Sequence, residues 1–180
     1  VSVEQRLSDL DSEYQRRYAL IDNLVVLVKE TKGFEQTLME FEKAVYIQTA
    51  EAKASATKLS LQAPEATKTR LGKEDRLSAS LSQFVEKFLV LAQHYPIIPD
   101  PVLKDRTATF TALERLAGDL KEIESTILDG RKSLNDAVRV YNQNRAIFPA
   151  NLWASAWHFQ ALEGFQVINE DARQDARITF

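Results

Sequence analysis

The stretch VSVEQRLSDLDSEYQRRYALIDNLVVLVKE, residues 1–30, indicates a helical fold because its apolar side chains recur at helical spacing. The apolar stripe consists of Val3, Leu7, Leu10, Tyr14, Tyr18, Ile21, Leu24, Val25 and Val28. Steps of three and four residues place these side chains on one face of an α-helix. Such a helix must pack its apolar face against other helices, so this stretch predicts a helical bundle.

The apolar spacing continues beyond Gly33 to about residue 55, but the stripe slips by one residue at that glycine. An unbroken helix over residues 2–55 would be a rod of about 80 Å, at 1.5 Å per residue. Glycine costs about 1 kcal/mol relative to alanine inside a helix. Gly33 is therefore the expected place for a bend. Two alternatives stay open: part of the long helix projects beyond the bundle, or the bend folds the second part back along the first.

Later segments follow the same pattern. Residues 58–73 are expected to form a connection, because Pro64 and Gly72 interrupt it and its polar residues show no helical stripe. A second helix is predicted over residues 74–94. Three prolines within residues 95–101 then exclude a continuous helix.

A third long helix is predicted from about Pro101 to about Phe148, with Asp100 as its N-cap. A short fourth helix is predicted over residues 151–164. The expected fold is an all-α, elongated, antiparallel bundle of three main helices plus this short C-terminal fourth, of the four-helix, up-and-down type. Residues 1–165 are expected to form one domain, and residues 166–180 a polar C-terminal tail.

Composition excludes several classes of function. A net charge of −3 and a pI near 5.5 provide no basic field for phosphate backbones, so nucleic acid is not an expected partner. The chain has no cysteine, which excludes disulfides, thiolate catalysis and cysteine-based zinc sites. No apolar run approaches the roughly 18 residues that a membrane span needs. Val1 is not expected to be the translation start, because the single methionine is Met39.

The sequence predicts no catalytic residue, no metal site and no cofactor. His94 and His158 belong to no metal-binding spacing, and His94 is interpreted as a helix-end residue. The five glycines are isolated, so no phosphate-binding loop is present. Acidic pairs such as Glu122 and Glu124 are typical of solvated helix faces. The chain is therefore not expected to be an enzyme.

Charged residues nevertheless fall on the predicted buried face. Continuing the third helix's seam by sevens from Ala117 gives Glu124, Arg131, Val138 and Arg145, while Arg17 lies beside the first stripe and Asn23 adjoins Leu24. One interpretation is a polar site for a ligand or an ion. The favoured alternative is an interhelical pair, such as Arg17 with Glu124, that sets the register between helices.

Trp153 and Trp157, four residues apart, share one face of the predicted short helix. They are a candidate surface for contact with a partner helix or a membrane. The favoured alternative places them in the core at the end of the bundle. The segment lacks the basic polar face of an interfacial membrane helix, which counts against a lipid role.

Two stretches resemble the LemA family of bacterial proteins. The first is QRRYALIDNLV, residues 15–25, followed by Val28 and Lys29. The second begins at Tyr95-Pro96 and ends at Phe148-Pro149, and Gly164-Phe165 is similar to the family's closing Gly-Phe. Between these ends the resemblance runs through Phe110, Leu113, Leu120, Ile123-Glu124, Ile127, Arg131, Asn135, Val138 and Tyr141-Asn142. The likeness covers residues 8–165 and identifies a divergent member, since Ala19 and Asp22 stand where the family usually has Asp and Pro.

The resemblance implies a helical bundle with no established catalytic activity. It also implies a single-pass membrane anchor before Val1, with the bulk of the protein on the cytoplasmic side or, alternatively, in the periplasm. The family's recurrent polar residues fall on Arg16, Arg17, Asn23, Glu124, Arg131 and Asn142, an expected internal polar network. We therefore expect a membrane-tethered scaffold that interacts with a protein partner; the alternative is a bundle that binds a small ligand or an ion through its internal polar residues.

Overall fold

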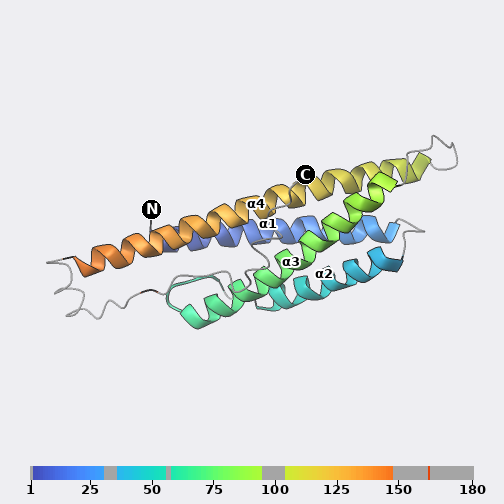
Figure 1. The fold of residues 1–180 in the computed structure, drawn as a ribbon. Helices are drawn as coiled ribbons and strands as arrows, with labels where there is room; N and C mark the ends of the chain where they lie inside the picture. Colours follow the sequence, from blue (N-terminus) through green and yellow to red (C-terminus); the bar gives the residue numbers. More distant parts are fainter. Residues whose placement is uncertain (1, 31–35, 56–57, 95–103, 148–161, 163–180) are drawn as a thin grey trace.

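The computed structural model describes residues 2–30, 36–55, 58–94, 104–147 and 162. These residues form four α-helices: α1 (Val3–Glu30), α2 (Gln36–Ala54), α3 (Pro64–His94) and α4 (Lys104–Ala146). Successive helices alternate in direction and lie side by side in an elongated bundle (Figure 1). The expected all-α, antiparallel bundle is confirmed.

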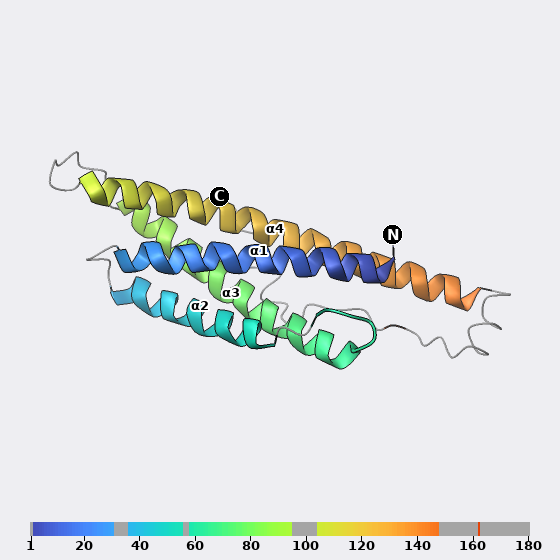
Figure 2. The same ribbon diagram turned by 180° about the vertical axis from the view of Figure 1, so that it is seen from behind.

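The four helices are not equivalent neighbours. α1 packs chiefly against α4, and α2 packs chiefly against α3. The reverse view shows α1 lying along α4 while α3 crosses obliquely behind them (Figure 2). The backbones of α1 and α3 make little contact, so long side chains must fill the space between these two helices.

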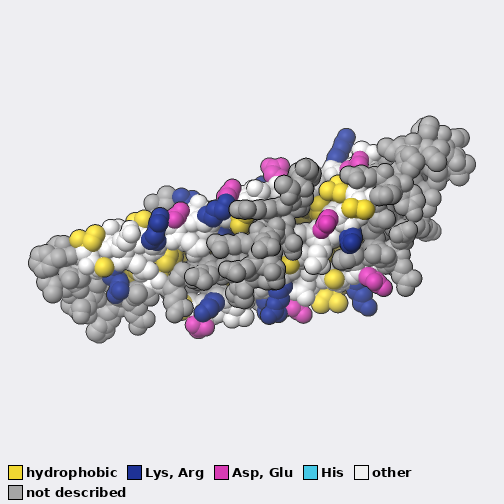
Figure 3. Space-filling view, in the orientation of Figure 1, with side chains coloured by type: hydrophobic (Ala, Val, Ile, Leu, Met, Phe, Trp, Pro, Cys, Tyr) yellow, Lys and Arg dark blue, Asp and Glu magenta, His cyan; other side chains and the backbone are white. Residues whose placement is uncertain are grey.

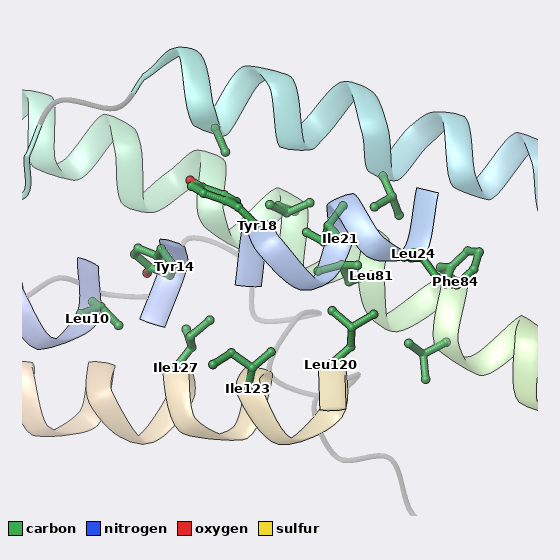
Figure 4. Close-up of a cluster of buried hydrophobic side chains, with 14 of the residues drawn as sticks. Leu10, Tyr14, Tyr18, Ile21, Leu24, Leu81, Phe84, Leu120, Ile123 and Ile127 are labelled. Atoms are coloured by element: carbon green, nitrogen blue, oxygen red, sulfur yellow. The ribbon is translucent and has the colours of Figure 1, made fainter. Parts of the chain in front are cut away.

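The apolar stripe of α1 lies at the centre of the core. Tyr14, Ile21 and Leu24 are buried, as the spacing predicts. Figure 4 shows these α1 side chains in one cluster with Leu120, Ile123 and Ile127 of α4 and with Leu81 and Phe84 of α3. Burying such a stripe against α3 and α4 supplies the main hydrophobic stabilisation of the bundle.

Ser2 fixes the start of α1. Its hydroxyl oxygen accepts a hydrogen bond from the backbone N–H of Gln5, at 3.2 Å. This satisfies one of the N–H groups that a helix leaves unpaired at its first turn. The cap and the stripe together explain why the helix begins at Val3.

The first predicted helix is divided in two. α1 ends at Glu30 and α2 begins at Gln36, so the chain folds back on itself across the region of the expected bend. Gly33 itself lies outside the described residues. Lys53 of α2 forms an ion pair with Asp22 of α1 at 2.8 Å, which ties the returning helix to the first.

The expected connection over residues 58–73 is wrong, because α3 already begins at Pro64. Proline is favoured at the first position of a helix, where its missing N–H costs nothing. Thr67 closes the preceding turn: its hydroxyl donates to the carbonyl oxygen of Ser60 at 2.9 Å and accepts from the N–H of Ser60 at 3.1 Å. Gly72 lies inside the helix rather than at its end.

α4 agrees with the predicted third helix to within a few residues at each end. Asp100, Pro101 and the predicted helix over residues 151–164 lie outside the described residues. On the face seen in Figure 3, basic and acidic side chains are intermixed along the bundle. Across the described helices, none has an apolar stretch sufficient for a membrane crossing.

Candidate functional site: a buried ionic network

Arg17 is the centre of a cluster of charged side chains inside the bundle. Its side chain is 0% exposed. One terminal nitrogen donates to Glu124 of α4 at 2.8 Å and to the hydroxyl of Ser78 of α3 at 2.6 Å. The other donates to the carboxylate of Glu74 on α3. One side chain of α1 therefore joins α3 and α4.

Glu74 receives hydrogen bonds from two α1 side chains. Besides the guanidinium of Arg17, the hydroxyl of Tyr18 donates to its carboxylate. Arg70, one turn earlier on α3, places its Nε 3.5 Å from the same carboxylate. Glu74 is completely buried, and a buried carboxylate needs such partners because its desolvation is costly.

Two further arginines extend the network toward the start of α1. Arg70 pairs with Asp11 of α1 at 2.5 Å. Arg131 of α4 donates from Nε to the hydroxyl oxygen of Tyr14 at 3.0 Å and from Nη2 to the carbonyl oxygen of Leu71 at 3.0 Å. Arg131 also forms an ion pair with Asp75 of α3.

Tyr14 contacts three arginines of the network. Its hydroxyl oxygen accepts a hydrogen bond from Arg131, and its ring faces Arg17 and Arg70. The guanidinium carbons of Arg17 and Arg70 lie 5.1 Å and 5.9 Å from the centre of its ring. Both separations are within the range of favourable cation–π contact. The ring therefore fills space between helices and also faces two of the buried positive charges.

The environment keeps these groups in their ordinary protonation states at neutral pH. Burial raises the pKa of Tyr14 to about 12, even though Arg131 and Arg17 oppose that rise. Burial and the hydrogen bond to Glu74 likewise raise the pKa of Tyr18. Burial disfavours the charged form of Arg17, but Glu124 and Glu74 outweigh burial and raise its pKa. None of these shifts brings a group's pKa toward neutrality, where acid–base catalysis operates.

The six predicted polar residues divide into three groups, of which Asn142 forms the third. Arg17, Glu124 and Arg131 lie in the network, and the predicted pair of Arg17 with Glu124 is present. Arg16 and Asn23 are exposed, so their placement inside the bundle is wrong. Each adjoins a buried residue in sequence, but adjacent residues on a helix point about 100° apart. Arg16 lies instead 3.9 Å from Glu13 on the surface.

Asn142 lies outside the ionic network and holds a different part of the chain. Its side-chain amide donates to the carbonyl oxygen of Leu162 at 2.7 Å, and its side-chain oxygen accepts from the N–H of Leu162 at 3.0 Å. It also helps to line a groove of about 440 Å³ along the C-terminal part of α4. Asn142 therefore fixes a backbone segment rather than a buried charge.

Several members of the network were not predicted from the sequence: Asp11, Arg70, Glu74, Asp75 and Ser78. Four of these belong to α3: Arg70 lies in the segment expected to be a connection, whereas Glu74, Asp75 and Ser78 lie in the predicted helix over residues 74–94. The buried positions Thr67, Arg70, Leu71 and Glu74 do recur at three- and four-residue spacing. That spacing is the available signal for a helix, but most of these residues are polar, so they form no apolar stripe.

The remaining candidate residues lie elsewhere. Trp153 and Trp157 are outside the described residues. Among the residues that are described, no cluster of histidine, cysteine, aspartate and glutamate side chains is suited to hold a metal ion.

Comparison with known proteins gives one match. The model of the LemA family matches residues 6–180, which includes the segment interpreted as a tail. No curated protein and no solved structure matches the chain. The match covers nearly the whole sequence and agrees with the resemblance over the first and last long helices; the chain belongs to the LemA family.

Proposed function

We propose that this chain is the helical bundle of a non-enzymatic, membrane-tethered scaffold that binds another protein. One observation carries the proposal: each buried arginine of the network faces a carboxylate of a different helix, namely Arg17 with Glu74, Arg70 with Asp11 and Arg131 with Asp75. Charges arranged in this way set the register of the helices. A rigid, register-locked rod is suited to presenting surfaces at a fixed spacing.

The alternative, a bundle that binds a small ligand or an ion, would use the same internal polar residues. A ligand site needs polar groups that converge on a cavity. Here the groups converge on one another, as the bonds from Arg17 to Glu74, Glu124 and Ser78 illustrate. This arrangement supports the scaffold over the ligand-binding alternative.

Thermal unfolding separates the two proposals. The chain is heated alone and with divalent cations, and separately with small carboxylates and amines. The ligand-binding alternative predicts a rise in the unfolding midpoint that Glu124→Gln abolishes, because binding to the native state stabilises it. The scaffold predicts no such rise. A saturable rise that Glu124→Gln removes would contradict the scaffold.

The tether rests on the family resemblance, and fractionation of the natural full-length protein tests it. We propose a single membrane-spanning helix before Val1 and a bundle on the cytoplasmic side. After cell breakage the protein should sediment with membranes and be released by detergent but not by high salt. Protease added to intact spheroplasts should leave the bundle uncut. Recovery in the soluble fraction would contradict the tether, and cleavage in intact spheroplasts would indicate the periplasmic side.

A further inference from the structure

α2 has an apolar outer face that nothing in the described part of the bundle covers. Val45 and Thr49 are buried against the other helices, and Ile47 lies about 160° around the helix axis from each of them. Ile47 is 45% exposed, and the neighbouring Tyr46 is 58% exposed. Figures 1 and 2 both show α2 at one edge of the bundle, so this face points away from the molecule.

The residues around Ile47 are arranged symmetrically in sequence. Lys43 and Ala44 precede it, and Ala50 and Glu51 follow it at the same separations in reverse order. All four are exposed. Within the described part of the chain, neither Lys43 nor Glu51 takes part in an ion pair. The face is therefore apolar at its centre, with opposite charges toward its two ends.

We propose that this face is a self-association surface, on which α2 pairs antiparallel with α2 of a second copy about a two-fold axis at Ile47. A two-fold axis brings residues equally far from Ile47, in opposite directions, to the same level. Ile47 then meets Ile47 of the second copy. Lys43 of each copy lies level with Glu51 of the other, which gives two identical ion pairs.

The small side chains allow the helices to approach. Ala44 and Ala50 flank the seam beside the charged residues and leave room for the long side chains of Lys43 and Glu51 to reach across it. A parallel pairing would instead place Lys43 against Lys43 and Glu51 against Glu51, and like charges at a close contact are unfavourable. The charge pattern therefore selects the antiparallel arrangement and a second copy of this chain as the occupant.

The size of the face predicts a weak dimer. Three layers of side chains on a single helix bury well under the roughly 800 Å² per partner of a standard interface. We expect dissociation constants on the order of 100 μM. Sedimentation equilibrium from about 10 μM to about 1 mM covers that range.

The first arm of the test changes the centre of the face. The wild-type chain should show a monomer–dimer equilibrium, and Ile47→Glu should be monomeric throughout the concentration range. Val140→Glu on α4 is the matched control, because Val140 is a similarly exposed apolar residue, 49% exposed, on another helix. A monomeric wild type, or a dimer that Ile47→Glu leaves intact, would overturn the proposal.

The second arm tests the antiparallel register. Lys43→Glu and Glu51→Lys should each weaken dimerisation about tenfold, since each turns two attractive pairs into repulsive ones. Arg115→Glu on α4, an exposed charge reversal, should leave it unchanged. Mixed in equal amounts, the two α2 variants should form heterodimers at least as stable as the wild-type dimer, because a glutamate at position 43 then faces a lysine at position 51.

The mixing result distinguishes a specific interface from a general loss of folding. Circular dichroism should show the same helicity for every variant. If the mixture dimerises no better than the separate variants, Lys43 does not meet Glu51 and the proposed register is wrong.

Discussion

Arg17 has no access to water, so its charge depends entirely on the groups around it. A buried ion pair gives little net stability compared with an apolar pair of the same size, but removing one partner is costly. The free energy of unfolding should therefore fall strongly when one charge of a buried pair is removed, and change little when both are replaced by apolar side chains.

Glu74 and Glu124 both bind Arg17 but differ in burial. Glu74 is completely buried, whereas the side chain of Glu124 is 21% exposed. We expect Glu74→Ala to lower the free energy of unfolding by about 3–5 kcal/mol and Glu124→Ala by about 2 kcal/mol. Urea unfolding followed by circular dichroism measures both. If both variants lost the same small amount of unfolding free energy, the greater burial of Glu74 would have no effect on stability.

Tyr14 predicts the response of the protein to alkali. Its pKa is about 12 in the folded protein and 10.0 ordinarily, so the folded state holds the hydroxyl proton more tightly than the unfolded state does. The corresponding stability, roughly 2–3 kcal/mol, is complete below about pH 10 and is lost as the pH rises through about 12.

Tyr14→Phe isolates this contribution. The variant should be less stable at neutral pH, because Arg131 loses the oxygen to which its Nε donates. Its free energy of unfolding should then fall less steeply than that of the wild type between about pH 10 and about pH 12. Parallel curves for the two proteins would show that the Tyr14 hydroxyl titrates as it does in the unfolded chain.

At the scale of helices, the sequence predicts the elements whose buried face is apolar. The stripe of α1 from Val3 to Val28 is buried as expected. The first turns of α3, before Glu74, are not predicted because their buried face contains Thr67 and Arg70. Polar residues at helical spacing resemble a solvated connection until the partners on α1 and α4 are known.

Gly118 offers a test of α4 that leaves packing unchanged. A methyl group added at this position would meet no atom within 4 Å. Gly118→Ala should therefore raise the free energy of unfolding by about 0.5–1 kcal/mol, the difference in helix propensity.

Gly130→Ala is the matched comparison. A methyl group there would lie 3.4 Å from Cδ1 of Leu10 on α1. Because that separation is at the lower limit of ordinary van der Waals contact, we expect a smaller gain than at Gly118. Chemical unfolding of both variants under the same conditions checks the order, and a loss of stability at Gly118 would contradict the helical placement of α4 at this point.

Across the whole molecule, the candidate site could be predicted only in part. Periodicity indicated that Arg17, Glu124 and Arg131 face inward, and it suggested the Arg17–Glu124 pair. It could not indicate Glu74, the other carboxylate of Arg17, because α3 crosses α1 obliquely and its register depends on the packing of all four helices. The sequence therefore predicts inward-facing charges more readily than their partners.

We infer that the buried charges lock the helices to one another. A double-mutant cycle of Arg17→Met and Glu74→Met, measured by urea unfolding, tests it across the α1–α3 contact. Each single variant should lose about 3–5 kcal/mol, because it leaves a charge buried without its main partner. The double variant should lose at least about 2 kcal/mol less than the sum of the two. Losses that add to within about 0.5 kcal/mol would contradict a direct buried pair.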